Sequence, residues 1–408
     1  MYVSATAQPH RGPLTRADST APTGPATGAL TDYHVATLGH YALKGAALVF
    51  IEATGVTANG RISPNCPGLW ADAQVPGVRR VAAFARSQGA LAGIQLAHAG
   101  RKASTTAPWV GGRARGASTR ATAEVGGWPS EVVGPMGGEA WCWDLKGLAP
   151  EGGFWPPRQL SVAEIAETVE AFGQAARRAV EAGIDVVEIH AAHGYLIHQF
   201  LSPITNRRTD QYGGSFENRT RLLREVIQEV RRNIPETMPL FLRMSSTEWM
   251  EETDLGKQFG SWDVESTIKV AKQLPSLGVD LLDVSSGGNH PDQRIQMFNS
   301  KDYQVKIANR IRQEVRAEGS KLFIGAVGLI TEAEQAANIV QDDNTIAQEA
   351  ETAAAMTDAK GGKQPMADVI LVARQFMREP EWVLRVAWKL GVDIAWPSQF
   401  LRVRFPKL

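Results

Sequence analysis

Cysteine is almost absent from this chain, which has only Cys66 and Cys142 among its 408 residues. The two residues lie far apart in the sequence and form no Cys-x-x-Cys spacing. Secreted domains stapled by disulfides and cysteine-based metal modules both need more cysteines than this. The scarcity therefore fits a reducing compartment, so we expect a cytoplasmic protein, and it argues against a metal site built from these two residues.

Net charge and long apolar runs are lacking as well. The 43 Lys and Arg residues balance the 43 Asp and Glu residues, and there is no basic stripe, so we expect no nucleic-acid partner. No apolar run approaches the roughly 18 residues of a membrane helix, so we expect no membrane partner. The first residues lack the basic and apolar regions of a secretory signal. A transit peptide stays open as an alternative, because Arg11 and Arg16 are present and acidic residues are few there.

The chain does contain a regular alternation of short apolar runs with longer amphipathic segments, which is typical of βα units and a parallel sheet. Strands are predicted at 47–53, 91–96, 184–189, 239–244, 279–285, 321–325 and 367–373. Helices are predicted near 32–45, 74–88, 161–182, 216–233, 263–275, 302–317, after Thr331 and near 380–390. This series begins with a helix. It predicts an α/β fold, a (β/α)8 TIM barrel whose first strand is missing or atypical.

Capping residues mark three of the helix starts. Asp32 is expected to cap the first helix, and Gly45 suits its C-terminal end. Ser161 with Glu164, and Thr331 with Glu334, have the spacing of capping boxes, in which the two side chains bond each other's backbone N–H groups.

Several segments fall outside the alternation. Residues 1–30 are rich in Thr, Ala, Pro and Gly, and we expect an irregular segment ahead of a barrel domain at 31–408. Residues 103–158 bring glycines, prolines and a tryptophan cluster, and we interpret them as an excursion that caps the strand ends; a merely decorated loop is the alternative. Residues 341–365 are a polar insertion, and 391–408 form a C-terminal tail. The tryptophan cluster comprises Trp109, Trp128, Trp141, Trp143 and Trp155.

The stretch 188–203 is where we expect the chemistry, because an apolar strand ends there in titratable side chains. His190, His193 and Tyr195 follow the strand directly, and in parallel α/β proteins ligands bind at the carboxyl ends of strands. Two histidines three residues apart could also be a structural pair or metal ligands, but no third ligand lies within sequence range. The loop 202–219 that follows is rich in turn formers, and loops of that length inside a compact domain are usually functional.

Seven ordered motifs resemble the old yellow enzyme family of FMN-dependent ene-reductases, and most of all its YqjM-like, thermophilic-like class (class III) in a fungal style. The likeness runs from about residue 29 to 404. The motifs are Thr31–His34, Glu52–Val56, Gly60–Ile62, Gly93–Lys102, Glu188–Pro203, Asp210–Arg219 and Val372–Arg374.

The resemblance implies an NADPH dehydrogenase that transfers hydride from NADPH or NADH to FMN. Reduced FMN then passes hydride to the β-carbon of an alkene conjugated to a carbonyl, so the partner is a small enone or enal. His190 and His193 match the family's substrate-binding pair, whose N–H groups would stabilise charge developing on the carbonyl oxygen. Tyr195 matches the proton donor, and a phenol with a pKa near 10 is an adequate acid for a carbanion-like centre.

The same resemblance assigns residues to the cofactor. Ala53 and Gln95 match positions that bond the isoalloxazine edge, and Arg243 matches the cation beside N1 and O2 of the flavin. A phosphate site is implied where the last two strands end. Its residues are Gly325, Ala373 and Arg374, with Ala373 standing where many relatives have glycine.

The C-terminal tail also carries a family feature. Arg402 matches an arginine that, in this class, enters the active site of a neighbouring subunit, which implies a homodimer or homotetramer. A solvated tail arginine is the alternative.

The chain departs from the family at its start. Relatives begin with a strand that carries flavin contacts, whereas this chain opens with Met1–Ala5, at best a fragment of that motif. Either residues 1–8 pair as a makeshift strand, or strands 47–53 and 367–373 keep unpaired edges and the chain folds poorly. We expect the second. A truncated or non-catalytic protein with impaired FMN binding is therefore the alternative to an active enzyme. An aldolase-like barrel with Lys102 as its Schiff-base lysine is a third hypothesis.

Overall fold

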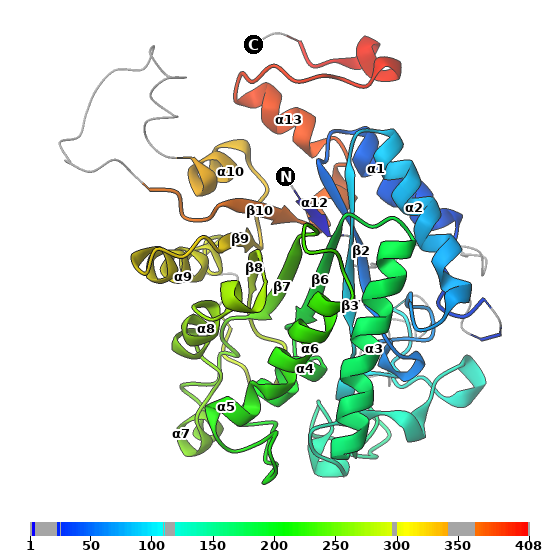
Figure 1. Cartoon of the computed structure of the whole chain (residues 1–408), viewed down its shortest axis with the longest axis vertical. Helices are drawn as coiled ribbons and strands as arrows, with labels where there is room; N and C mark the ends of the chain where they lie inside the picture. Colours follow the sequence, from blue (N-terminus) through cyan, green and yellow to red (C-terminus); the bar gives the residue numbers. More distant parts are fainter. Residues whose placement is uncertain are drawn as a thin grey trace.

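The computed structural model describes residues 2–4, 23–24, 26–108, 110, 119–295, 300–341 and 364–406. Eight parallel strands close a barrel in the order β1-β10-β9-β8-β7-β6-β3-β2, with helices packed around its outside (Figure 1). The predicted (β/α)8 class is therefore confirmed. The strands are β1 (Tyr2–Ser4), β2 (Leu48–Gly55), β3 (Leu91–Ala97), β6 (Val186–Ala191), β7 (Leu240–Ser245), β8 (Leu281–Ser285), β9 (Phe323–Val327) and β10 (Val369–Val372).

The first strand corrects an expectation. Residues 2–4 pair in parallel with β10 on one side and with β2 on the other. The unpaired edges expected at 47–53 and 367–373 are therefore wrong. Our prediction rested on the side-chain volume that a barrel interior needs, whereas ladder pairing uses backbone N–H and C=O groups, which almost any sequence supplies.

The long helices follow the predicted alternation. They are α1 (Asp32–Leu43), α2 (Val75–Ser87), α3 (Val162–Glu181), α6 (Arg221–Arg232), α8 (Val264–Ala271), α9 (Val305–Ala317), α10 (Ala333–Val340) and α13 (Trp382–Lys389). The predicted helix 216–233 is divided into α5 (Phe216–Arg219) and α6, and three short helices were not predicted: α4 (Leu196–Leu201), α7 (Asp254–Phe259) and α12 (Arg374–Arg378). They lie in loops, where too few residues are helical to give a periodic pattern.

Two of the three predicted helix starts need correction. Asp32 is the first helical residue and Thr31 is the N-cap, with His34 completing the box. The helix after Thr331 is capped by Glu332 instead, and the Thr331 N–H bonds the Gln335 side chain. The box of Ser161 with Glu164 is confirmed, with both reciprocal bonds formed at 3.2 and 2.8 Å. A one-residue shift in the chain's entry to a helix is enough to change its cap.

The barrel interior is divided into an apolar and a polar level. Alternate residues of each strand point inward, and one end is filled by Phe50, Val186, Phe241, Leu371 and their apolar neighbours. Towards the strands' carboxyl ends the inward positions become polar. Those on four neighbouring strands are Gln95, Glu188, Arg243 and Asp283, all buried. A polar level above an apolar plug places the site at the carboxyl end of the barrel.

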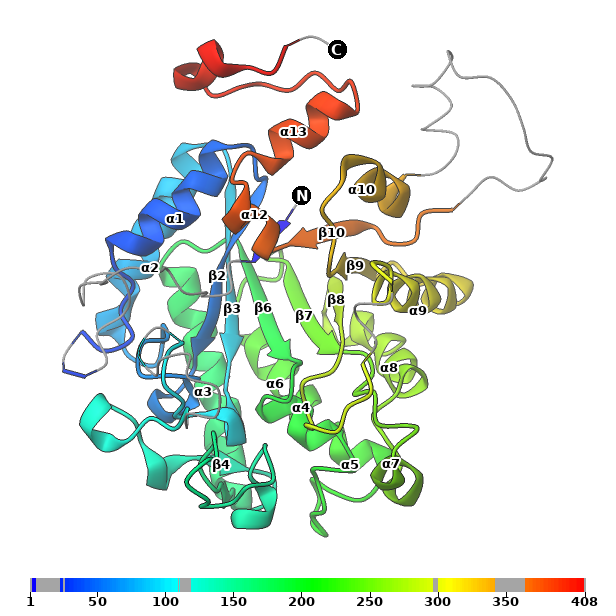
Figure 2. The same ribbon diagram turned by 180° about the vertical axis from the view of Figure 1, so that it is seen from behind.

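The excursion and the tail lie at opposite ends of the molecule (Figure 2). Within the excursion, β4 (Val133–Gly134) pairs with β5 (Arg158–Gln159), near the end where the site residues gather. The tail ends in a short 3-10 helix, Ser398–Val403, beyond α13. Trp109, most of the 341–365 insertion and most of residues 1–30 lie outside the described residues. Among the described helices, none is long and apolar enough to cross a membrane.

Candidate active site

The loop after β6 turns sharply through two residues with left-handed backbone. His193 has φ of 58° and Gly194 has φ of 71°. The His193 N–H donates to Ser245 Oγ at 2.9 Å, and Ser245 in turn donates to the Gly287 carbonyl at 2.8 Å. A Cβ on Gly194 would lie 2.2 Å from the Gly288 carbonyl oxygen. The turn thus needs glycine at 194 both for its backbone angle and for the close approach of the loop after β8.

The two histidine rings are held in place by neighbours. His190 Nδ1 accepts the Ala192 N–H at 3.1 Å, which leaves Nε2 as the protonated nitrogen of a neutral ring. His193 Nε2 lies 2.6 Å from Ser285 Oγ. Burial, with the charge of Arg243 as a second cause, lowers the pKa of both histidines well below the usual value. Both rings are therefore neutral at pH 7; His190 can offer its Nε2–H to a ligand, and His193 can offer its Nδ1–H when Ser285 donates to its Nε2.

Tyr195 lies against the same rings. Its ring centre is 5.0 Å from that of His190, and the two histidine rings are 5.1 Å apart, all edge to face. Tyr195 also packs on a small apolar cluster of Ala99, Ala103 and Val132, on which Ile62 and two excursion tryptophans, Trp128 and Trp155, pack as well. Burial raises the pKa of Tyr195, so the phenol keeps its proton at any pH the protein meets. The structure thus brings the three predicted catalytic residues together.

Lys102 and Trp143 meet this loop, although the motif reading gave neither a role in the reaction. Lys102 Nζ donates to the carbonyls of His193 at 2.9 Å and Gly288 at 3.1 Å. Trp143 Nε1 donates to the same Gly288 carbonyl at 2.9 Å. Burial lowers the pKa of Lys102 to about 7. The only sequence signal for Lys102 was its place in the Gly93–Lys102 motif, and Trp143 was one tryptophan among five.

A β-bulge brings together the residues assigned to the flavin edge. Ile51 pairs with Ile94 and Thr54 with Leu96, so that two residues of β2, one of them Ala53, oppose Gln95 alone. Bulges bend a strand and re-aim its side chains, and they are common beside active sites. Gln95 is buried, and its amide donates to Glu188 on β6 at 2.6 Å.

Arg243 lies next to His190 in the sheet register and pairs with a carboxylate on its other side. His190 pairs with Arg243, and Arg243 pairs with Asp283. Arg243 Nε is 3.1 Å from Asp283 Oδ2, and both side chains are buried. Asp283 carried no signal in the sequence reading, because a single acid in an apolar strand suggests nothing about its partner.

The residues assigned to the phosphate are spread along two strands. Gly325 lies inside β9, where a Cβ would meet the Leu371 side chain at 2.5 Å. The end of β9 carries Gly328 instead, with φ of 107°. Ala373 and Arg374 follow β10, and Arg374 is exposed. Burial raises the pKa of Tyr303, and the charges of Arg374 and Arg243 both act against that rise.

Arg402 does not join the other site residues in this chain. It is exposed in the tail, in the 3-10 helix next to Phe400, whose ring lies 4.0 Å from Lys44 Nζ. Trp388 Nε1 donates to the Pro406 carbonyl at 2.5 Å. The tail is thus tied to α1 and α13, at the other end of the molecule from the excursion (Figure 2).

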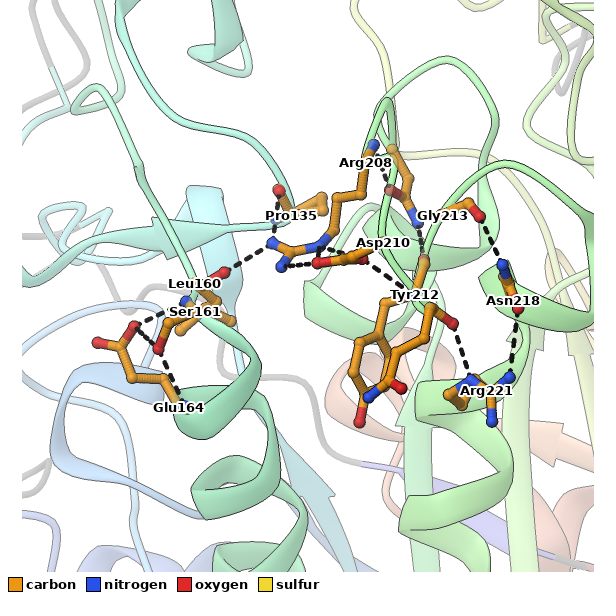
Figure 3. A network of polar contacts seen from close by, with 12 residues as sticks. Pro135, Leu160, Ser161, Glu164, Arg208, Asp210, Tyr212, Gly213, Asn218 and Arg221 are labelled. Atoms are coloured by element: carbon orange, nitrogen blue, oxygen red, sulfur yellow. Dashed lines mark hydrogen bonds and ion pairs between the residues drawn. The ribbon is translucent and has the colours of Figure 1, made fainter.

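A separate polar network supports the excursion (Figure 3). Arg208 is buried and forms an ion pair with Asp210 at 2.5 Å. It also donates to the carbonyls of Pro135 at 3.1 Å and Leu160 at 2.6 Å, which flank β4 and β5. These bonds fasten the loop 202–219 to the excursion, and we call the two segments together the frame. The polar side chain of Arg208 bonds within this frame.

The arrangement fits a flavin and offers little to a metal. Among the described residues, no group of three or more His, Cys, Asp and Glu side chains could hold a metal ion. Gln95 supplies an amide and Arg243 a cation at the polar level of the barrel, beside the bulged strand β2, and Arg374 is exposed directly after β10. An isoalloxazine edge alternates donors and acceptors, carries charge when reduced, and is linked to a phosphate, so this set of groups suits it.

Comparison with known proteins points the same way. The profile of the NADH:flavin oxidoreductase / NADH oxidase family matches residues 10–348. An NADH:flavin oxidoreductase of Gibberella zeae is 40% identical over 375 residues, which cover 91% of this chain and 81% of that protein. An NADPH dehydrogenase of Bacillus subtilis is 36% identical over 376 residues, which cover 92% and 89%. A solved morphinone reductase in complex with tetrahydroNAD matches with a TM-score of 0.60 at 25% identity, covering 93% and 87%.

Proposed function

The chain belongs to the NADH:flavin oxidoreductase / NADH oxidase family, which is the old yellow enzyme family, and we propose that it reduces the C=C bond of α,β-unsaturated carbonyl compounds. As a family member it is an oxidoreductase that uses a flavin and a nicotinamide cofactor. Membership also decides against the hypothesis of an aldolase-like barrel. The narrower reaction is our inference from the site.

The observation that carries the proposal is the pairing of two neutral histidines with a protonated tyrosine. His190 keeps a hydrogen on Nε2, because its Nδ1 accepts a backbone N–H. When Ser285 donates its hydroxyl hydrogen to Nε2 of His193, the hydrogen of that ring is on Nδ1. Two N–H donors on neighbouring rings suit one carbonyl oxygen, and they favour the charge that develops on it during reduction.

Tyr195 is the proposed proton donor to the α-carbon. Its ring lies against His190, so the phenol is near the place where those histidines would hold the carbonyl. A buried phenol whose pKa is raised stays protonated, and a carbanion-like carbon is basic enough to take its proton.

FMN, when bound, would supply the hydride that it receives from NADPH or NADH. Ala53, Gln95 and Arg243 would hold the ring edge. Gly328, Ala373 and Arg374 would hold the phosphate, whereas Gly325, which the resemblance also assigned to it, lies inside β9 and not at its end. Arg243 would act as the fixed positive charge beside the ring, and the apolar plug below it would close the barrel to water.

The tail gives a second element to the proposal. Arg402 is far from its own chain's excursion, so any role at an active site would be in a neighbouring subunit, as expected for a homodimer or homotetramer. We propose a cytoplasmic enzyme acting on small enones or enals, with 31–408 as the FMN-binding domain. A solvated Arg402 would leave kinetics unchanged in Arg402→Ala.

The alternative is a family member that binds FMN poorly, which the short β1 favours, since within the described part of the chain this strand comprises Tyr2–Ser4. The absorption spectrum of the purified chain decides between the two. We expect a flavin spectrum with about one FMN per chain, which bleaches with NADPH and recovers its colour when an enone is added. A chain that stays colourless after incubation with FMN would reject the active enzyme.

A further inference from the structure

Asp283 is a buried acid that the proposed reaction does not use. It lies in the middle of β8, and its side chain is fully buried. Neither carboxylate oxygen has a hydrogen-bond partner among the described residues. Its register partner on β7 is Arg243, whose Nε lies 3.1 Å from Oδ2. Two residues further along, Ser285 contacts the His193 ring, so the same strand serves the site twice.

A carboxylate in this position is expensive for the fold. Removing an ion from water costs several kcal/mol even after relaxation, and an ion pair without further hydrogen bonds seldom recovers it. Burial raises the pKa of Asp283 to about 6, although the charge of Arg243 acts in the opposite direction. An apolar residue such as those flanking it, Leu282 and Val284, would fill a barrel interior at lower cost. Stability alone therefore does not account for an acid here.

The effect of Asp283 must reach the site through Arg243. Arg243 is adjacent to His190 on one side and to Asp283 on the other. An unpaired guanidinium at this level would place a full positive charge beside the ring system and next to two histidines whose pKa values it already lowers. A carboxylate at 3.1 Å offsets much of that charge, and in a buried place the offset is only weakly screened.

We propose that Asp283 is a positioning residue that holds Arg243 and reduces the positive field it exerts, so that reduced FMN is not stabilised too strongly to give up its hydride. The inference rests on the proposed function, because it takes the FMN ring to lie beside Arg243. Reduction adds negative charge to the ring edge. A stronger positive field there would favour the reduced form and raise the midpoint potential.

The test is the midpoint potential of bound FMN in Asp283→Asn, measured by dye-equilibrated titration of the FMN-loaded protein. We expect reduced FMN to be favoured over oxidised FMN by roughly tenfold more than in the wild type, which is about 30 mV for a two-electron couple. The dissociation constants of oxidised and reduced FMN should show the same tenfold difference independently. If Asp283→Asn does not fold, Asp283→Leu removes the charge and leaves no unpaired polar group.

Asp280→Asn is the matched control, because Asp280 is the exposed acid three residues earlier, whose carboxylate accepts the Leu240 N–H. It removes the same charge outside the barrel, and the potential should stay within the scatter of the wild type. Bound FMN with an unchanged potential in both Asp283 variants would overturn this inference and leave the proposed function standing. A wild-type chain that binds no FMN would overturn both.

Discussion

Two polar segments follow β6 in succession, and they use their side chains in opposite ways. In the first, at 190–195, each of the two neutral histidine rings has one nitrogen in contact with the protein, and their rings and that of Tyr195 lie edge to face. In the second, the loop around Arg208, the guanidinium is bonded to Asp210 and to two backbone carbonyls. The first segment leaves ring N–H and phenol groups for the ligand that we propose, whereas the second uses its polar groups within the protein.

Segments 190–195 and 202–219 are similarly polar in sequence, but their different bonding gives them different interpretations. We expected the 202–219 loop to be functional because of its length and its turn formers. Its buried bonds instead fasten the excursion, whose Trp128 and Trp155 pack on the same small apolar cluster as Tyr195. Variants in the two segments should therefore separate cleanly into losses of stability and losses of rate.

The largest effect is expected from breaking the frame. Arg208→Met removes the partner of the half-buried Asp210 and leaves two carbonyls without their donor, so the free energy of unfolding should fall by about 2–4 kcal/mol. Urea unfolding of the FMN-loaded protein would measure it. Arg232→Met is the control, because its ion pair with Glu229 is exposed. A rate per bound FMN that drops tenfold at unchanged stability would move Arg208 into the active site.

The next effect concerns the proton donor. Tyr195→Phe should slow alkene reduction by about 10²-fold or more, as general acids typically contribute, while reduction of FMN by NADPH stays nearly intact. Stopped-flow absorbance follows the two half-reactions separately. Tyr212→Phe is matched to it, since the Tyr212 hydroxyl serves the frame by donating to Glu225 at 2.9 Å. Equal slowing of both half-reactions in Tyr195→Phe would reject its role as the acid.

A smaller effect is expected on ligand affinity. In the double variant His190→Ala with His193→Ala, a phenolate over oxidised FMN loses both N–H donors. The charge-transfer band should vanish, and the dissociation constant of a phenol should rise at least tenfold, about 1.4 kcal/mol. His40→Ala, on the outer face of α1, is the control. Persistence of the band at unchanged affinity would show that the two histidines are structural.

The smallest effect lies at the edge of the frame, in the capping box of α3. The bond from Arg158, followed by those from Ser161, lowers the pKa of Glu164 to about 2. A carboxylate with a depressed pKa stabilises the fold above its unfolded pKa of about 4.3 and loses that contribution as the pH falls towards 2. Glu164→Gln should therefore cost about 0.5–1 kcal/mol at pH 7 and progressively less below pH 4.

Thermal midpoints at pH 7, 5 and 3 would show this convergence, with Glu167→Gln as a control on the same helix. A difference between variant and wild type that stays constant over this range would show that the charge of Glu164 does not matter to the cap.

Most strands and helices of the barrel could be predicted from the sequence, because the patterns that indicate them are local. Apolar runs such as 184–189 and the box of Ser161 with Glu164 depend on neighbours within a few residues. Two predicted N-caps were wrong by one residue, and the structure has Thr31 and Glu332 in these positions. The direction in which the chain enters a helix decides which residue becomes its N-cap. The pairing of the short β1 with β2 and β10 was not expected, because it uses backbone groups and therefore gives no pattern in the side chains.

The sequence by itself determined that His190, His193 and Tyr195 lie at the carboxyl end of one strand, because a short apolar strand followed by titratable residues is a local pattern. Only the tertiary structure decided what those residues face. Asp283 meets Arg243, Lys102 meets the His193 carbonyl, and Arg208 meets Leu160 across separations of 40, 91 and 48 residues. Closing the barrel creates these contacts, since parallel strands bring residues distant in the chain to the same level.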